Sequence, residues 1–170
     1  MAALARGAAL DSLVDVRSIP QSRRHPHFAR EAMEVWVPEQ TGAAYVWERA
    51  LGGFRKVDRN SANIALRHPS FRAYADYMET GVFRDALTRL LERAATVRLA
   101  ILCSETVWWR CHRRLISDAA VLLHHADVRH LMHDGTLRPH VPTAGVRLTE
   151  NGTLRYDVLV AANAAGKDGA

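Results

Sequence analysis

The sequence is short of cysteine, of long apolar runs and of glycine-rich phosphate motifs, and each shortage excludes a class of protein. Two cysteines in 170 residues are too few for a disulfide-stapled secreted domain, so a reducing compartment, the cytoplasm, is the expected location. No run of about 18 apolar residues occurs, and we therefore expect no contact with a membrane. Neither a Gly-x-Gly-x-x-Gly nor a Walker motif is present, and no cofactor is predicted.

The remaining composition is that of an ordinary globular protein. Apolar residues make up 48% of the chain and charged residues 24%, which suits one domain with its own core. The net charge of +5 favours an anionic partner, but only weakly, because arginine on helices usually forms a solvated face.

Short apolar or β-branched segments alternate with helical patterns over the first 132 residues. Strands are predicted at 13–18, 43–47, 97–102 and 127–132, and helices at 28–37, 71–80, 82–95 and from 111 onward. Pro38 is expected to close the first of these helices, and the polar segment 54–69 has no clear period. The order predicts an α/β domain, three-layered and Rossmann-like, with a small and mostly parallel sheet.

The pattern changes beyond Pro142. Asn151-Gly152 lies between two alternating segments, which is typical of a β-hairpin. We expect three parts: an α/β domain at 1–142, a hairpin extension at 143–162 and a disordered tail at 163–170. A third functional possibility, besides the two described below, is a structural or regulatory protein that forms a homodimer through this hairpin.

The residues with chemical potential concentrate between 97 and 124. A short apolar strand ends at Cys103, and Cys111 lies where an amphipathic helix begins. Ligands of open α/β sheets bind at this edge, often against a helix N-terminus. The helix dipole and the neighbouring arginines predict a lowered pKa and a nucleophilic thiolate at Cys111, with Cys103 as its partner. The alternative is that both cysteines are small buried apolar groups.

Three arginines, Arg17, Arg23 and Arg113, are the predicted anion clamp. Guanidinium groups pair bidentately with phosphate, sulfate or carboxylate, and Arg17 follows a strand that ends at the same sheet edge as the first cysteine if the strands are parallel. The alternative is that Arg17 pairs with Asp15 or Glu105 and only holds two loops together. Glu105 is also a candidate acid–base group.

Aromatic and imidazole groups complete the candidate site. His112 is expected to bind ligand beside the cysteines, Trp108 to stack on a flat ligand such as a base, and Tyr77 to belong to a lid. Core packing is the alternative for the aromatic residues.

Five residues offer the thiolate or imidazole ligands that zinc prefers: Cys103, Cys111, His112, His130 and His133. Their spacing matches no paired-ligand pattern, and a cysteine and a histidine that are neighbours in sequence seldom bind one ion. No metal is therefore predicted.

Several blocks of the chain resemble the bacterial and archaeal family known as domain of unknown function 488. They are Val14-Asp15-Val16-Arg17-Ser18 with Pro20, Ser22 and Arg23; Leu51-Gly52-Gly53; Arg67-x-Pro69-Ser70-Phe71-Arg72-x-Tyr74-Ala75-Asp76-Tyr77-Met78; Cys103-x-Glu105-x-Val107-Trp108-Trp109-Arg110-Cys111-His112-Arg113-Arg114; and Gly135-x-Leu137-x-Pro139-His140. The resemblance covers residues 11–140 and implies a Rossmann-like α/β fold without naming a reaction. The family usually begins with a further strand and helix. Only the tail of that helix fits residues 1–11, so we expect the strand, with its histidine and serine, to be missing.

Two functions remain from this reading. The first is a pocket formed by cysteine and arginine for a small anionic, nucleotide-like ligand, with thiol-based catalysis by Cys103, Cys111 and Glu105. The alternative is a nucleic-acid-binding module without catalysis, which uses the arginines and tryptophans and predicts steeply salt-dependent affinity.

Overall fold

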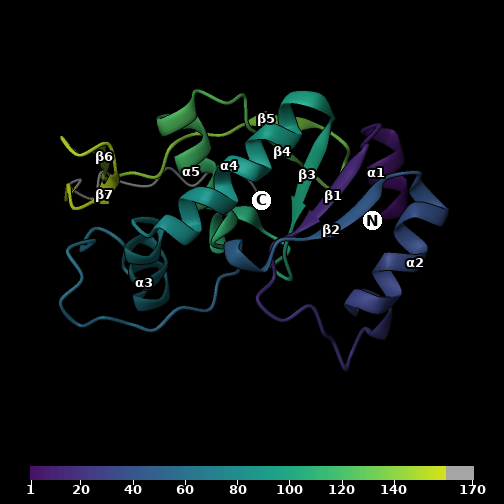
Figure 1. Ribbon diagram of the computed structural model, residues 1–170, viewed down its shortest axis with the longest axis horizontal. Coiled ribbons are helices and arrows are strands. Elements are labelled where there is room, and N and C mark those ends of the chain that lie inside the picture. The colour runs from purple at the N-terminus through teal and green to yellow at the C-terminus, as the bar shows by residue number, and fades with distance from the viewer. Residues whose placement is uncertain (160–170) are drawn as a thin grey trace.

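A three-stranded parallel sheet lies at the centre of the computed structural model, which describes residues 1–159 (Figure 1). The strands are β1 (Ser12–Asp15), β2 (Ala44–Trp47) and β3 (Leu99–Leu102), in the order β2-β1-β3. Ser12 is level with Ala44 on one side and with Leu99 on the other. These strands occupy three of the four predicted segments. The tail predicted at 163–170 lies outside the described residues.

The helices pack on both faces of this sheet (Figure 1). Neighbouring residues of a strand point to opposite faces: Leu13 packs with Met33 and Val37 of one helix, whereas Val14 packs in the larger cluster with Phe83 and Leu115. Five α-helices occur in the described part of the chain, α1 (Ala2–Gly7), α2 (Arg30–Thr41), α3 (Pro69–Met78), α4 (Gly81–Thr96) and α5 (Arg113–His124). The α/β class is confirmed, and the Rossmann-like assignment stays a prediction.

Helix α2 does not end at Pro38, as the sequence suggested. It continues to Thr41, whose hydroxyl donates to the carbonyl of Val37 (2.6 Å). It ends at Gly42, which adopts a φ of 73° and donates its N–H to the carbonyl of Pro38. A proline inside a helix costs about 3 kcal/mol. Val37 is completely buried, so packing of this last turn against the sheet offsets that cost.

The fourth predicted strand does not join the parallel sheet, which is a second correction. β4 (Arg129–Leu131) pairs antiparallel with β5 (Leu137–Pro139), and the turn between them contains Gly135 at a φ of 84°. Strands of a parallel sheet are buried on both faces and read as continuous apolar runs. β4 instead carries an exposed arginine beside a buried histidine, which suits a ribbon with one solvated face.

The C-terminal hairpin is confirmed and is shorter than predicted. β6 (Val146–Leu148) pairs antiparallel with β7 (Leu154–Tyr156), and Gly152 in the turn has a φ of 72°. Leu154 and Tyr156 are buried in the same core cluster as Tyr74 of α3. The hairpin therefore closes part of the main core. None of the helices formed by residues 1–159 has the length and apolar character that a membrane crossing requires.

Candidate active site

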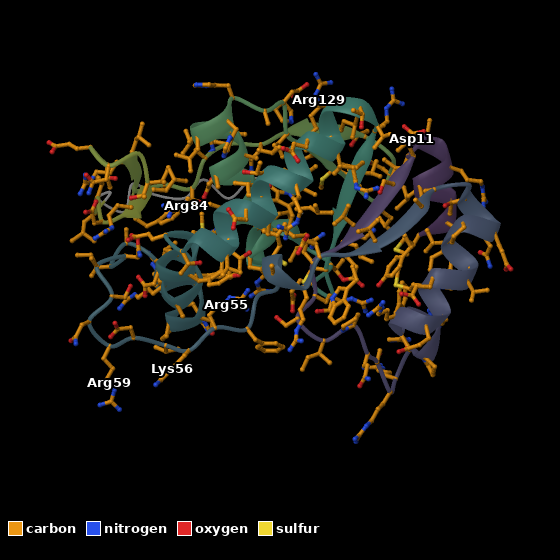
Figure 2. All side chains as sticks on the ribbon, in the orientation of Figure 1. Asp11, Arg55, Lys56, Arg59, Arg84 and Arg129 are labelled. Atoms are coloured by element: carbon orange, nitrogen blue, oxygen red, sulfur yellow. The ribbon has the colours of Figure 1, made fainter. Side chains whose placement is uncertain are left out.

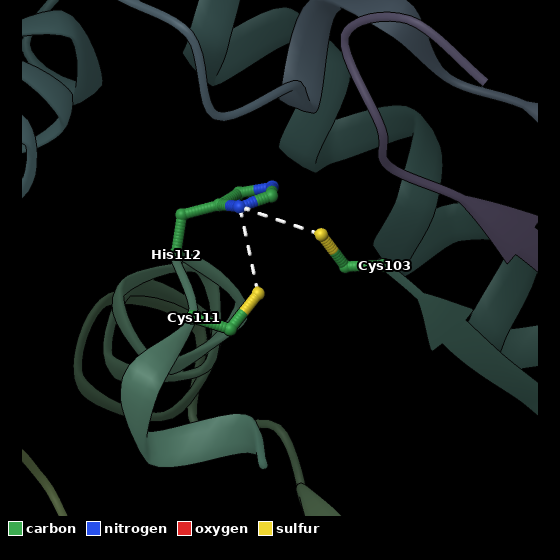
Figure 3. A group of neighbouring side chains, drawn as sticks. All are labelled: Cys103, Cys111 and His112. Atoms are coloured by element: carbon green, nitrogen blue, oxygen red, sulfur yellow. Dashed lines mark hydrogen bonds between the residues drawn. The ribbon is translucent and has the colours of Figure 1, made fainter. Parts of the chain in front are cut away.

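Two thiols and one imidazole meet at the carboxyl edge of the sheet (Figure 3). Cys103 follows β3 directly, and Cys111 and His112 directly precede α5. The Nδ1 atom of His112 lies 3.9 Å from the sulfur of Cys103 and 3.6 Å from the sulfur of Cys111. These three atoms are all within 4.8 Å of one another. The strand–loop–helix segment thus brings together both cysteines and the histidine that the sequence singled out.

The backbone of β1 fixes the orientation of the imidazole. The Nε2 atom of His112 lies 3.0 Å from the carbonyl oxygen of Val16, just beyond the end of β1. A carbonyl only accepts hydrogen bonds, so Nε2 carries a hydrogen. In the neutral ring Nδ1 is then an acceptor, and it faces both sulfurs. The ring of Tyr74 packs beside this imidazole, with centroids 5.0 Å apart.

Two glycines make this approach possible. A Cβ atom on Gly53 would lie 2.6 Å from Nδ1 of His112, and one on Gly52 would lie 2.5 Å from the hydroxyl oxygen of Ser18. Both distances are shorter than any that real side chains tolerate. The Leu51-Gly52-Gly53 block, which the sequence marked only through the family resemblance, is therefore needed for the imidazole to reach the sheet edge.

The two thiols differ in acidity, in the opposite sense to the sequence-based prediction. Hydrogen bonding from Cys111, together with that from His112, holds the pKa of the Cys103 thiol well below its usual value despite partial burial. The pKa of the Cys111 thiol is raised, first by its hydrogen bond with Cys103 and then by its burial. Cys111 is 2% exposed, whereas Cys103 is half-buried. The prediction of a lowered pKa at Cys111 is wrong, because a neighbouring thiolate and burial outweigh the helix terminus and Arg113.

Arg113 is the predicted clamp arginine that contacts the cluster. Its Nε donates to the sulfur of Cys111 at 3.4 Å, and its Nη2 donates to the backbone carbonyl of Glu105. The guanidinium therefore ties the 103–111 loop to the first turn of α5. Glu105 contributes its backbone carbonyl to this contact, and the residue itself is exposed.

The side chain of Arg17 is directed away from the thiols. Its Nε donates to both carboxylate oxygens of Asp15 at 2.9 Å, and its Nη2 lies 3.2 Å from the sulfur of Met33 in α2. The hydroxyl of Tyr45 also donates to Asp15, at 2.6 Å. Val16 belongs to the core cluster on the α4 and α5 side, so the next residue points to the α2 side. Arg17 thus forms the buried pair that the sequence offered as the alternative.

The remaining residues of the predicted site either lie apart from the thiols or make their side-chain contacts with other parts of the molecule. Arg23 is exposed in the loop after β1. Trp108, in the 3-10 helix η3 (Trp108–Arg110), stacks flat on His130 with ring centroids 3.6 Å apart, whereas Trp109 is 47% exposed. The hydroxyl of Tyr77 donates to the carbonyl of Ala50 at 2.6 Å.

A buried network that the sequence did not predict lies behind the tryptophan. Asp118 accepts hydrogen bonds from the hydroxyl of Tyr156 (2.9 Å) and pairs with His140 (2.8 Å), which in turn lies 2.9 Å from His130. Burial, and then the neighbouring His140, lower the pKa of His130 to about 4. The side chains of this network come from α5, both hairpins and the segment between them, so no local pattern in the sequence indicates it. The Gly135-x-Leu137-x-Pro139-His140 block of the family resemblance was the only sequence feature that included one of its residues.

The structure groups fewer possible metal ligands than the five residues that the sequence offers. His130 belongs to the buried network and His133 is exposed, so the three grouped ligands are Cys103, Cys111 and His112. Although Cys111 and His112 are adjacent in sequence, their ligand atoms lie within 4.8 Å of each other and of the sulfur of Cys103. Cys111 and His112 precede the regular turns of α5, where the backbone is still free to direct both side chains to one side.

A separate cavity lies away from the thiol cluster. It has a volume of about 110 Å³ on the α4 side of the sheet, and none of the cluster residues contributes to it; its lining consists of Val14, Val46, Glu48, Arg89, Leu90 and Arg93. No cysteine, serine or histidine lines this cavity, and its charged walls are the long side chains of Glu48, Arg89 and Arg93, so it is a weaker candidate site than the thiol cluster.

Comparison with known proteins finds one family. The profile described as "Domain of unknown function DUF488" matches residues 1–120. No curated protein and no solved structure matches the chain. The matched span contains the two cysteines, His112 and Gly53, whereas His130 and His140 lie beyond it.

Proposed function

The chain belongs to the DUF488 family, and we propose that its Cys103–Cys111 pair is a dithiol centre that exchanges disulfides with a small anionic substrate. One observation carries the proposal: a single imidazole nitrogen lies 3.6 and 3.9 Å from the two sulfurs. Because the other nitrogen is held by the carbonyl of Val16, the ring is positioned to exchange protons with either thiol.

Accessibility assigns the roles of the two sulfurs. Cys103 is half-buried and Cys111 is 2% exposed, so Cys103 is the sulfur that a substrate can reach. Cys103 passes its proton to Nδ1 of His112, and its thiolate attacks one sulfur of a substrate disulfide. The new S–S bond forms as the substrate bond breaks, and the departing thiolate takes that proton from the His112 imidazolium.

The second step resolves the mixed disulfide. Cys111 gives its proton to Nδ1 of His112 and attacks the sulfur of Cys103, which expels the second half of the substrate as a thiolate. That thiolate takes the proton from His112. The substrate disulfide is thus reduced to two thiols, and the two cysteines lose two electrons and two protons as their own disulfide forms. The reverse sequence oxidises a dithiol substrate.

The charges around the cluster favour an anionic substrate. The Arg113 guanidinium lies 3.4 Å from the sulfur of Cys111, and the first N–H groups of α5 point toward the same edge with the positive end of the helix dipole. The chain carries a net charge of +5. If the substrate carries a flat, nucleotide-like group, the exposed Trp109 is the ring of η3 that is available to stack on it.

The experiment combines reduced, chelator-treated protein with oxidised glutathione, an anionic disulfide, and follows each cysteine by mass spectrometry. The wild-type protein is expected to end with the Cys103–Cys111 disulfide, and Cys111→Ser to accumulate the mixed disulfide on Cys103. Hydroxyethyl disulfide is the uncharged comparison, and Arg113→Gln should slow the reaction with the anionic probe by a larger factor than the reaction with the uncharged one. If Cys103→Ser reacts at Cys111 as fast as the wild-type protein reacts at Cys103, the proposal fails.

One observation favours a second function, nucleic-acid binding. Figure 2 shows Lys56 and Arg59 extending from the segment before α3, and Phe54 in the same segment is 78% exposed. Basic groups beside an exposed aromatic ring suit a single-stranded nucleic acid. A fluorescent oligonucleotide whose affinity falls steeply with salt, and falls further in Lys56→Gln/Arg59→Gln, would support this function.

A further inference from the structure

We propose that Cys103, Cys111 and His112 also bind a thiophilic divalent cation of the zinc class, and that the bound cation closes the dithiol to disulfide exchange. The metal site follows from the geometry of three side chains. Its effect on exchange rests on the function proposed above.

The distances fit a tetrahedral ion. With metal–sulfur bonds of about 2.3 Å and a metal–nitrogen bond of about 2.0–2.1 Å, two ligands on one tetrahedron are about 3.6 Å apart for sulfur and nitrogen. The observed separations from Nδ1 of His112 are 3.6 Å for Cys111 and 3.9 Å for Cys103. All three ligand atoms lie within 4.8 Å of one another, so small side-chain rotations suffice to enclose an ion.

The surroundings of the ligands also match those of a metal site. A metal-bound histidine usually donates its second ring N–H to a carbonyl or carboxylate, which fixes the tautomer. Nε2 of His112 makes this contact with Val16. Arg113 directs an N–H at the sulfur of Cys111, which stabilises a coordinated thiolate. Two thiolates neutralise a divalent ion, so the completed site is not strongly charged.

The ligand set indicates an exchangeable ion. Structural zinc sites have four protein ligands, whereas sites with three keep a position open for water or substrate. Three ligands occur in the described part of the chain, and Cys103 is accessible. A sulfur that is bound to the metal shares its lone pair with the ion and cannot use it to attack a substrate disulfide. Conversely, once Cys103 and Cys111 form a disulfide, they no longer supply thiolates to bind a metal. Metal binding and oxidation therefore exclude each other.

The test titrates chelator-treated, reduced protein with Co²⁺, whose thiolate charge-transfer absorption reports sulfur ligation directly. We expect one ion per chain. His112→Gln and Cys103→Ser should each weaken binding by more than about 100-fold, because the loss of a ligand exceeds the 10–100-fold cost of losing its outer partner. His133→Gln, which changes an exposed histidine, is the matched control and should bind as the wild-type protein does. Circular dichroism verifies the fold of each variant, and two ligand variants keep the test valid if one is unstable.

The outcomes separate the two proposals. The metal site is refuted if no charge-transfer band appears, if His112→Gln binds like wild type, or if the oxidised protein binds Co²⁺ equally well. Zn²⁺ at saturating concentration should also slow exchange with oxidised glutathione in the wild-type protein, and unchanged exchange refutes the inhibition. A metal-binding protein that never exchanges disulfides refutes the proposed function, and with it the inhibition, but leaves the metal site standing. Exchange without metal binding refutes only this inference.

Discussion

Replacement of Gly53 by alanine tests the packing that directs His112 at the two sulfurs. The added Cβ would lie 2.6 Å from Nδ1 and 3.0 Å from Cε1, whereas ordinary contacts are 3.4–4 Å. The ring must therefore move by about 1 Å, which stretches its 3.0 Å contact with the carbonyl of Val16 to roughly 4 Å, beyond hydrogen-bond range. Overpacking costs about 1–3 kcal/mol, and the lost hydrogen bond about 1 kcal/mol. We expect Gly53→Ala to lower the free energy of unfolding by about 2–4 kcal/mol.

Urea denaturation measures this loss, and the exchange rate with oxidised glutathione measures the displacement of the imidazole. Gly81→Ala is the matched control, because no atom lies within 4 Å of a Cβ at that position and the residue begins a helix. The control should be as stable as the wild-type protein or up to about 1 kcal/mol more stable. If Gly53→Ala retains both wild-type stability and wild-type exchange, the reasoning about the Gly53–His112 contact is refuted.

Two further predictions concern groups outside the thiol cluster. The pKa of His130 falls from 6.5 to about 4 on folding, so the unfolded chain binds more protons between these values. The contribution of His130 to the free energy of unfolding is therefore greatest above pH 6.5. As the pH falls towards 4 the free energy of unfolding decreases, by at most about 3 kcal/mol. Urea denaturation of His130→Gln at pH 7 and pH 4.5 should show a smaller difference than the wild-type protein, and an equal difference contradicts the assignment. Arg17→Met leaves Asp15 buried without its cation, which should cost about 3–5 kcal/mol in urea. The folded fraction should still exchange disulfides at the wild-type rate, and a loss of exchange without a loss of stability would return Arg17 to the site.

Local sequence patterns were sufficient for the sheet and for the meeting of the two cysteines. β1 centres on Leu13 and Val14 and β3 is a short apolar run, and parallel pairing brings their carboxyl ends to one edge. The direction of Arg17 was also accessible, because Val16 is apolar and core-facing, and strand alternation then turns Arg17 to the other face. The number of charges at a strand end does not show which face of the sheet each charge occupies.

Other features depend on contacts between segments far apart in the chain. The Asp118–His140–His130 network needs the β4–β5 hairpin to pack on α5, and no local period signals that docking. Pro38 stays inside α2 because Val37 is buried against the sheet. The difference in acidity between the two thiols depends first on the hydrogen bond between them and then on burial, and a helix terminus in the sequence reveals neither.

The central claim is that Cys103, Cys111 and His112 act as one unit in which Cys103 is the reactive sulfur. Its most direct measurement is the rate at which iodoacetamide alkylates each cysteine in the native, reduced and metal-free protein, followed by peptide mass spectrometry. We expect Cys103 to be modified well before Cys111, and His112→Gln to narrow the difference between the two alkylation rates. Modification of Cys111 first, or equal rates at both positions, would contradict this claim.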